Sequence, residues 1–180
     1  LLPEHKTEDD QFDEQDVPFM SDTSHPYGQA KFIANQTVNK FIADHPNLSF
    51  EITSVSPVGV MGKSLSSRQD STSTGIQFLF KNKIAPNPFF QMFYDNDIYF
   101  ALVDVADVAE AIYKAATTNN IHGKNYLLSR ESYRVSDITL MLNNQSPAGK
   151  PKIFYRNDLA KKDLAIKFNP ASVPLNNYSS

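Results

Sequence analysis

The chain has 180 residues, enough for one domain with a real core, and its 41% hydrophobic and 12% aromatic content is typical of a globular protein rather than a disordered one. A net charge of −3 argues against general nucleic-acid binding, because no basic stripe is available to neutralise phosphates. The absence of cysteine excludes disulfides, thiolate nucleophiles and cysteine-based metal sites.

The acidic, polar residues 4–24 open the chain, and we expect them to form a solvated loop or a disordered leader. No apolar run reaches the length of a membrane span, and the start lacks the charged and apolar regions of a signal peptide, so we expect a cytoplasmic protein without a membrane partner. Because the first residue is Leu1 and not Met, we also expect a fragment or a processed chain.

A helix is predicted from Tyr27 to about Asp44, where apolar residues recur with a period close to 3.6 and Pro46 prevents continuation. Partial alternation predicts a strand over 48–56. The glycine-bearing loop 57–62 follows this strand directly, and open parallel sheets place ligands at such positions.

The middle of the chain is predicted as a polar loop over 63–74 and a short apolar helix over 75–83. Seven aromatic or methionine side chains crowd into 89–100. They favour core and hairpin packing, and the alternative is the aromatic wall of a substrate pocket.

Strands and helices alternate in the last part, which predicts an α/β fold. Asp104 or Asp107 is expected to cap one helix, and Ser136 or Asp137 another. The expected elements are strands over 99–105, 125–129 and near 153–155, and helices over 108–118, from about 136 to 142, and near 158–166.

Tyr27 and Lys31 carry the clearest chemical pattern, because residues four apart on a helix share one face. A phenol in this position can act as an acid or base beside an ammonium that stabilises its phenolate. Tyr-x-x-x-Lys also arises by chance in a chain with eight tyrosines, and Tyr27 alone fits equally well as a packing residue at a helix start.

Four segments in order resemble the latter part of the extended short-chain dehydrogenase/reductases, in particular the NAD-dependent epimerase/dehydratase and dihydroflavonol-reductase-like group. They are Tyr-Gly-Gln-Ala-Lys at 27–31, Ser-Pro-Val-Gly-Val-Met-Gly at 56–62, Leu-Val-Asp-Val-Ala-Asp-Val-Ala-Glu-Ala at 102–111, and a strand and helix over 125–142. The resemblance implies a partial Rossmann-like doubly wound sheet, its second half, with a small α/β substrate-binding part at the C-terminus. After the acidic loop or leader, placed at 1–26, it implies the second half of the dinucleotide-binding domain over 27–62 and a substrate-binding part over 63–180 interleaved with the last Rossmann elements.

In this family, the residue at Tyr27 is the acid/base and the residue at Lys31 contacts the nicotinamide ribose and stabilises the tyrosine's ionised form. The resemblance therefore implies NAD or NADP as cofactor, with Tyr27, Lys31 and the loop residues Pro57, Val58, Gly59 and Val60 binding it. Gly59 is expected to allow a close backbone approach. The expected partners are a small-molecule substrate and a second copy bound through the helix over 27–44.

Two family features are missing from the sequence. The six glycines do not form the Gly-x-x-Gly-x-x-Gly turn that holds a pyrophosphate at a helix N-terminus. The family's catalytic serine would fall at or before Leu1, and Ser21 and Ser24 lie too close to Tyr27 to take its role. We therefore expect part of a longer oxidoreductase or epimerase, inactive by itself, and the alternative is a non-catalytic remnant that acts as a binding or interaction module.

Other site classes have little support in the sequence. The Gly-Lys-Ser at 62–64 lacks the first glycine of a phosphate-binding loop, because Pro57 stands there. The four histidines have no ligand-like spacing, residues 95–97 lack the rest of a calcium loop, and no Gly-x-Ser-x-Gly elbow is present. We expect no metal site.

Overall fold

The computed structural model describes residues 10–16, 20–62 and 72–169 as an α/β structure. Its elements in chain order are α1 (Pro26–Asp44), β1 (Ser54–Pro57), β2 (Gly59–Met61), α2 (Thr72–Asn82), α3 (Pro88–Asp95), β3 (Tyr99–Asp104), α4 (Val105–Thr117), β4 (Asn125–Leu128), β5 (Ser132–Arg134), α5 (Val135–Leu142) and α6 (Asp158–Leu164). Within this part of the chain, no helix combines the length and the apolar character needed to cross a membrane.

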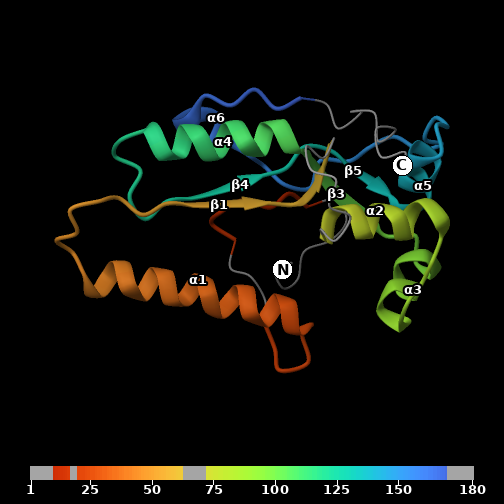
Figure 1. Ribbon diagram of the computed structural model, residues 1–180, viewed down its shortest axis with the longest axis horizontal. Helices are drawn as coiled ribbons and strands as arrows, with labels where there is room; N and C mark the ends of the chain where they lie inside the picture. The colour runs from red at the N-terminus through yellow and green to blue at the C-terminus, as the bar shows by residue number, and fades with distance from the viewer. Residues whose placement is uncertain (1–9, 17–19, 63–71, 170–180) are drawn as a thin grey trace.

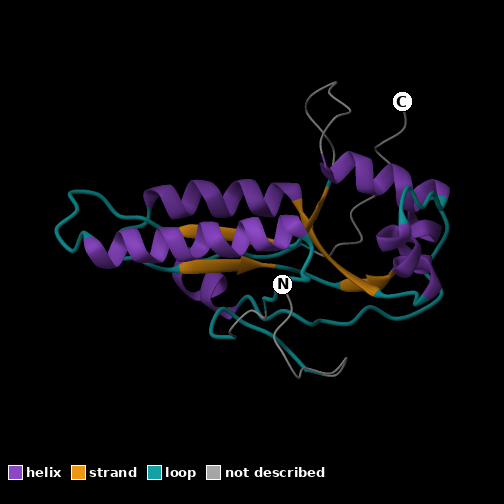
Figure 2. Ribbon diagram, turned by 90° about the horizontal axis from the view of Figure 1, so that it is seen from below, coloured by secondary structure: helices purple, strands orange, loops and turns teal. Residues whose placement is uncertain are grey.

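Two small sheets form the centre of the molecule. β1 pairs in parallel with β4, while β3 pairs in parallel with β2 and antiparallel with β5. α4 and α6 lie over one face of the β1–β4 pair and α1 lies below the other (Figure 1). α2, α3 and α5 gather at one end of the molecule, beside β3 and β5 (Figure 2). The predicted α/β fold, a partial Rossmann-like sheet, is confirmed.

The first core lies between the β1–β4 pair and the two helices above it. β4 alternates between half-buried and buried residues, and its buried Tyr126 and Leu128 pack against α4 and α6. α4 contributes Ala111 and α6 contributes Leu164. A leucine such as Leu164 gains about 1.5–3 kcal/mol when its side chain is fully buried, so this contact fixes the helices on the sheet.

The second core is aromatic and joins α2, α3, β3 and α5. Phe80 of α2 is completely buried, and its ring meets Phe93, Tyr94 and Phe100 edge to face at centroid distances of 5.3–6.3 Å. The core-packing interpretation of the aromatic segment is thus confirmed. The hairpin expected in the same segment is wrong, because its first residues form the helix α3. Asn87 caps this helix by accepting a hydrogen bond from Phe90 N at 3.1 Å.

Several predicted boundaries change because contacts with distant residues decide them. The strand expected over 48–56 begins at Ser54, since the Glu51 carboxylate accepts hydrogen bonds from Asn120 N and Ile121 N, and Ile52 N donates to His122. The strand expected near 153–155 is reduced to isolated bridges, and β2 appears inside the expected loop 57–62.

Helix caps also differ in part from the prediction. Asp104, one of the two residues expected to cap this helix, caps α4 by accepting a hydrogen bond from Ala106 N at 2.6 Å. Neither Ser136 nor Asp137 caps α5: Asp97 does so from the α3–β3 loop, by accepting from the backbone N–H of Ser136 at 2.8 Å. Asp137 instead accepts from Ala148 N and Gly149 N.

The leader is folded against the molecule over residues 10–16, so a fully solvated leader is wrong there. Phe12 is buried, donates its N–H to Phe154 O at 2.6 Å and accepts from Arg156 N at 2.7 Å. Glu14 accepts a hydrogen bond from Leu127 N at 2.9 Å. This contact occupies an outward N–H of β4, whereas no strand of the described residues pairs with the free edge of β1.

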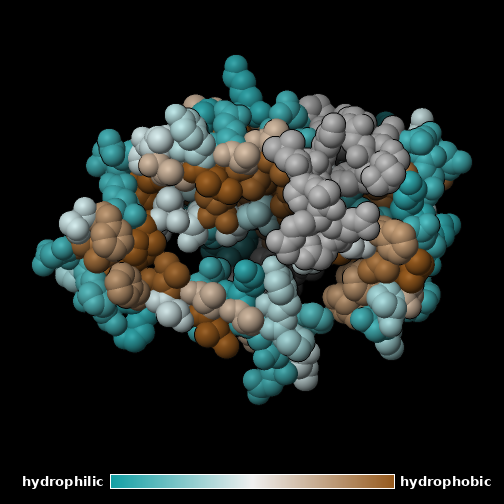
Figure 3. Space-filling model, viewed as in Figure 1, coloured by the Kyte–Doolittle hydropathy of each residue, from teal (hydrophilic) through white to brown (hydrophobic). Residues whose placement is uncertain are grey.

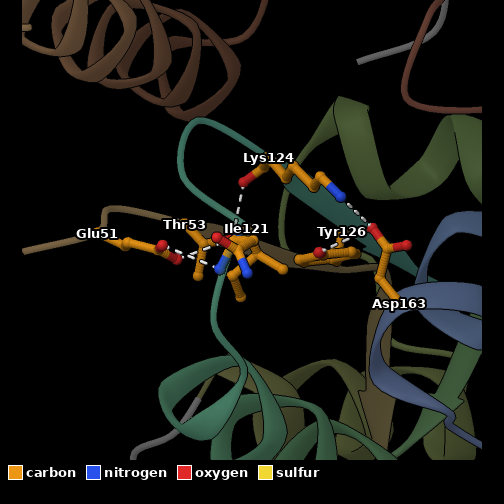
Figure 4. A network of polar contacts seen from close by, with 7 residues as sticks. Glu51, Thr53, Ile121, Lys124, Tyr126 and Asp163 are labelled. Atoms are coloured by element: carbon orange, nitrogen blue, oxygen red, sulfur yellow. Dashed lines mark hydrogen bonds and ion pairs between the residues drawn. The ribbon is translucent and has the colours of Figure 1, made fainter.

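A polar network fastens α6 and the loop before β4 to the first core (Figure 4). Lys124 Nζ lies 2.6 Å from Asp163 Oδ2, which also accepts from the buried Tyr126 hydroxyl at 3.1 Å. The hydrogen bond from Lys124 lowers the pKa of Asp163, and burial followed by the contact with Asp163 raises the pKa of Tyr126. Hydrogen bonds from the backbone at Ile121 and Asn120 lower the pKa of Glu51.

Candidate functional site

The candidate site begins at the first turn of α1. His25 is the N-cap residue and Pro26 is the first helical residue, a position that suits proline because its missing N–H would have no helical partner. The Nδ1 atom of His25 accepts a hydrogen bond from Tyr27 N at 3.3 Å. The Gln29 side chain donates to Ser24 O at 2.7 Å and fixes the chain that enters the helix.

Tyr27 and Lys31 lie one turn apart on α1, as the motif predicts. Lys31 Nζ is 5.5 Å from the centroid of the Tyr27 ring, and the Tyr27 side chain is 66% exposed. The phenol is thus accessible to a ligand and accompanied by a positive charge.

Residues 57–60 connect the two sheets. Pro57 ends β1 opposite Leu128, Val58 N donates to Leu128 O at 3.0 Å, and Gly59 begins β2 opposite Leu102. The end of β1 and the start of α1 lie on the same side, near the middle of the long axis of the molecule (Figure 1). The carboxyl end of this parallel pair is where α/β sheets bind ligands.

Gly59 is required by the packing of β2 on β3. A Cβ atom there would lie 2.4 Å from Phe100 Cε1 and 2.8 Å from the carbonyl oxygen of Ala101. The close approach seen at Gly59 is that of a neighbouring strand of the same chain, and an approach of the cofactor to this residue stays a prediction.

The start of α1 also contacts α3. The His25 ring stacks on the Phe89 ring with a centroid distance of 4.9 Å and an interplanar angle of 29°. Neither residue was predicted as a site residue, although Phe89 belongs to the segment for which a pocket wall was the alternative. An open depression beside α3, lined by residues that include Ala85, Gln91 and Met92, contains none of the predicted site residues.

α1 is weakly covered by the described residues. None of its side chains is buried, and Ile33 and Phe41 are 60% and 41% exposed. The space-filling view shows a hollow between α1 and the layer above it, bordered by apolar side chains (Figure 3). Exposed apolar surface of this kind is typical of a face that packs against another segment or another chain.

The family is decided by a match that spans most of the chain. The model of the NAD dependent epimerase/dehydratase family matches residues 3–129. The chain belongs to this family. The match includes Tyr27, Lys31 and the loop 57–60, so the predicted resemblance is confirmed. No curated protein matches the chain.

Solved structures share the fold at low sequence identity. The yeast methylglyoxal/isovaleraldehyde reductase Gre2, complexed with NADPH, has a TM-score of 0.71 and 21% identity, over 94% of this chain and 56% of that one. The UDP-glucuronic acid 4-epimerase from Bacillus cereus, in complex with NAD, has a TM-score of 0.65 and 18% identity, over 95% and 53%. The UDP-glucose 4-epimerase from Thermotoga maritima, with UDP-glucose, has a TM-score of 0.67 and 17% identity, over 96% and 57%. The chain thus spans little more than half the length of these structures.

Proposed function

We propose that the chain is the second part of an NAD(P)-dependent oxidoreductase or epimerase that transfers hydride to or from a carbonyl or alcohol substrate. The observation that carries this proposal is the exposed Tyr27–Lys31 pair at the start of α1, in a chain of the epimerase/dehydratase family. Solved structures with the same fold include a reductase with NADPH and an epimerase with NAD. In this proposal, 27–62 belongs to the dinucleotide-binding domain and 63–180 forms the substrate side.

The proposed chemistry assigns one proton movement to Tyr27. When bound, the nicotinamide supplies the hydride to the carbonyl carbon or accepts it from the alcohol carbon. Tyr27 donates its phenolic proton to the carbonyl oxygen during reduction, and its phenolate takes that proton back from the alcohol during oxidation. Lys31 stabilises the phenolate by its positive charge.

The residues of this chain fit the nicotinamide end of such a cofactor. Lys31 lies beside Tyr27, and the loop 57–60 lies at the carboxyl end of β1. Because Val58 N already donates to Leu128 O, this loop would contact the cofactor through its carbonyl oxygens and side chains. The glycine turn that holds the pyrophosphate is absent from the sequence and would come from the other part of the enzyme.

The sheet edges support a longer parent enzyme. Glu14 occupies an outward N–H of β4, and the other edge of β1 has no partner strand among the described residues. Further strands of a doubly wound sheet would therefore add beside β1. α1 is the proposed dimer interface, because its apolar Ile33 and Phe41 are exposed.

A non-catalytic module that binds a partner is the second candidate. The observation that favours it is the missing glycine turn, since a chain without it cannot hold a dinucleotide in the usual way.

Titration of the purified chain with NADH and with NADPH, followed by cofactor fluorescence and thermal shift, tests whether this chain holds the cofactor by itself. The oxidoreductase proposal expects saturable binding that the double variant Tyr27→Phe/Lys31→Ala loses. Lys40→Ala is the matched control, because Lys40 is an exposed cation of the same helix that pairs with Asp44. No binding by the folded wild-type chain would contradict cofactor binding by this chain alone.

A further inference from the structure

The first turn of α1, which carries Tyr27, is capped by a histidine. The first backbone N–H groups of a helix have no helical partner and need another acceptor. Pro26 has no N–H to satisfy, and the N–H of Tyr27 donates to Nδ1 of His25 at 3.3 Å. The backbone of the proposed acid/base is therefore held by an imidazole, a group that titrates, where most helices use a hydroxyl, carboxylate or amide side chain.

This cap requires the neutral form of His25. A neutral imidazole has one ring nitrogen that accepts and one that donates, whereas both nitrogens of an imidazolium carry a proton. Protonation of His25 therefore removes the acceptor that Tyr27 N uses. The added charge also lies at the positive end of the helix dipole, and the first turn of α1 contains no acidic residue that would offset it.

The stacking of His25 on Phe89 does not share this requirement. The two rings lie 4.9 Å apart at an interplanar angle of 29°, and a cation is attracted to the face of an aromatic ring. Phe89 is itself supported by Phe93, which it meets edge to face at 4.8 Å. A protonated His25 thus keeps its contact with α3 while it loses its hydrogen bond from α1.

No bonded carboxylate compensates a charge on His25 within the described residues. The imidazole is exposed, so solvent can protonate it. The charged and titratable groups on the segments packed against it are Asp22 in the chain that enters α1, Tyr27 and Lys31 on α1, and Tyr94 and Asp95 on α3. The Tyr94 hydroxyl is bonded to Leu79 O and Ile84 O, and Asp95 accepts from Gln91.

We propose that His25 is a positioning residue that holds Tyr27 in place while its imidazole is neutral and releases the first turn of α1 when it is protonated. Histidine side chains change charge between pH 5 and 8, so the turn is capped at the alkaline end of this range and frays at the acid end. This inference rests on the proposed function, because it describes how the acid/base of that function is held.

The test is NMR spectroscopy of the full 180-residue chain, labelled with ¹³C and ¹⁵N, at pH 8 and at pH 5. The Cα shifts of Tyr27 and Gly28 report how often the first turn is helical. We expect the ratio of frayed to helical first turn to rise about fivefold in the wild type on acidification, the usual effect of losing one N-cap. His25→Asn, whose uncharged side chain caps at both pH values, should keep the low ratio, and His25→Ala should show the high ratio at both.

His45→Asn is the matched control, because His45 is the histidine at the other end of the same helix, where its ring stacks on Phe41 at 4.2 Å. This variant should keep the pH dependence of the wild type. Circular dichroism shows whether each chain is folded, and if His25→Ala is not, the comparison of His25→Asn with the wild type decides the result.

The same ratio at both pH values in the wild type, or an equal pH dependence in His25→Asn, would overturn the proposal. The measurement contains no cofactor. A failure of the chain to bind NADH or NADPH would therefore count against the proposed function and leave the result on His25 as it stands.

Discussion

Gly59 provides a direct test of how tightly β2 packs against β3. Alanine at this position places a Cβ atom 2.4 Å from Phe100 Cε1 and 2.8 Å from the oxygen of Ala101. The Phe100 ring is packed against Phe80 at 5.3 Å, and the Ala101 backbone belongs to a strand paired on both sides. Because neither group can move without disturbing a core or a strand pair, we expect Gly59→Ala to lower the free energy of unfolding by about 3 kcal/mol, the upper end for an overpacked site.

Urea unfolding followed by circular dichroism measures this change, and a loss of about 3 kcal/mol corresponds to a Tm lowered by about 6–12 °C for a chain of this size. Gly75→Ala is the matched control, because no atom lies within 4 Å of its added Cβ and the residue is in α2. That variant should gain about 0.5–1 kcal/mol from reduced backbone entropy. Equal stabilities of the two variants would refute the steric reasoning.

Three further variants test the core and the polar network. Phe80→Ala should lower the free energy of unfolding by about 3–5 kcal/mol in the same urea assay, since it removes a fully buried ring. Because the pKa of Tyr126 is raised in the folded state, the wild type loses stability as the pH rises through about 10, where the tyrosine of the unfolded chain ionises. Tyr126→Phe should lack this loss when urea midpoints are compared between pH 8 and 11. Because the pKa of Asp163 is lowered in the folded state, its carboxylate stabilises the fold above about pH 4, and this contribution is lost on acidification. In Asp163→Asn, the free energy of unfolding should therefore fall less between pH 7 and pH 3 than it does in the wild type.

Elements with local signals were predictable from the sequence. The α4 helix follows from its alanine-rich composition and from Asp104, which caps it within the same segment. The strand β2 and the cap of α5 could not be predicted, because both depend on distant residues. Gly59 of β2 pairs with Leu102, and Asp97 caps α5 from another loop. Phe12 shows the same limit, since its burial depends on residues 154–156 at the far end of the chain.

The candidate site divides in the same way. Tyr27 and Lys31 are brought together by helix geometry alone, so their spacing was sufficient to predict their contact. The stacking of His25 on Phe89 depends on how α3 is placed against α1, for which neither segment carries a sequence signal. The role of Gly59 depends equally on the position of β3.

The hydrogen bond between Glu14 and Leu127 has a consequence for self-association. Glu14 occupies one outward N–H of β4, while the edge of β1 has no partner strand within the part of the chain that the structure describes. Pro57 shortens this edge, because it has no N–H to donate. Two copies that joined through β1 would each use the other's β1 edge, so a contact of this kind is a symmetric pair.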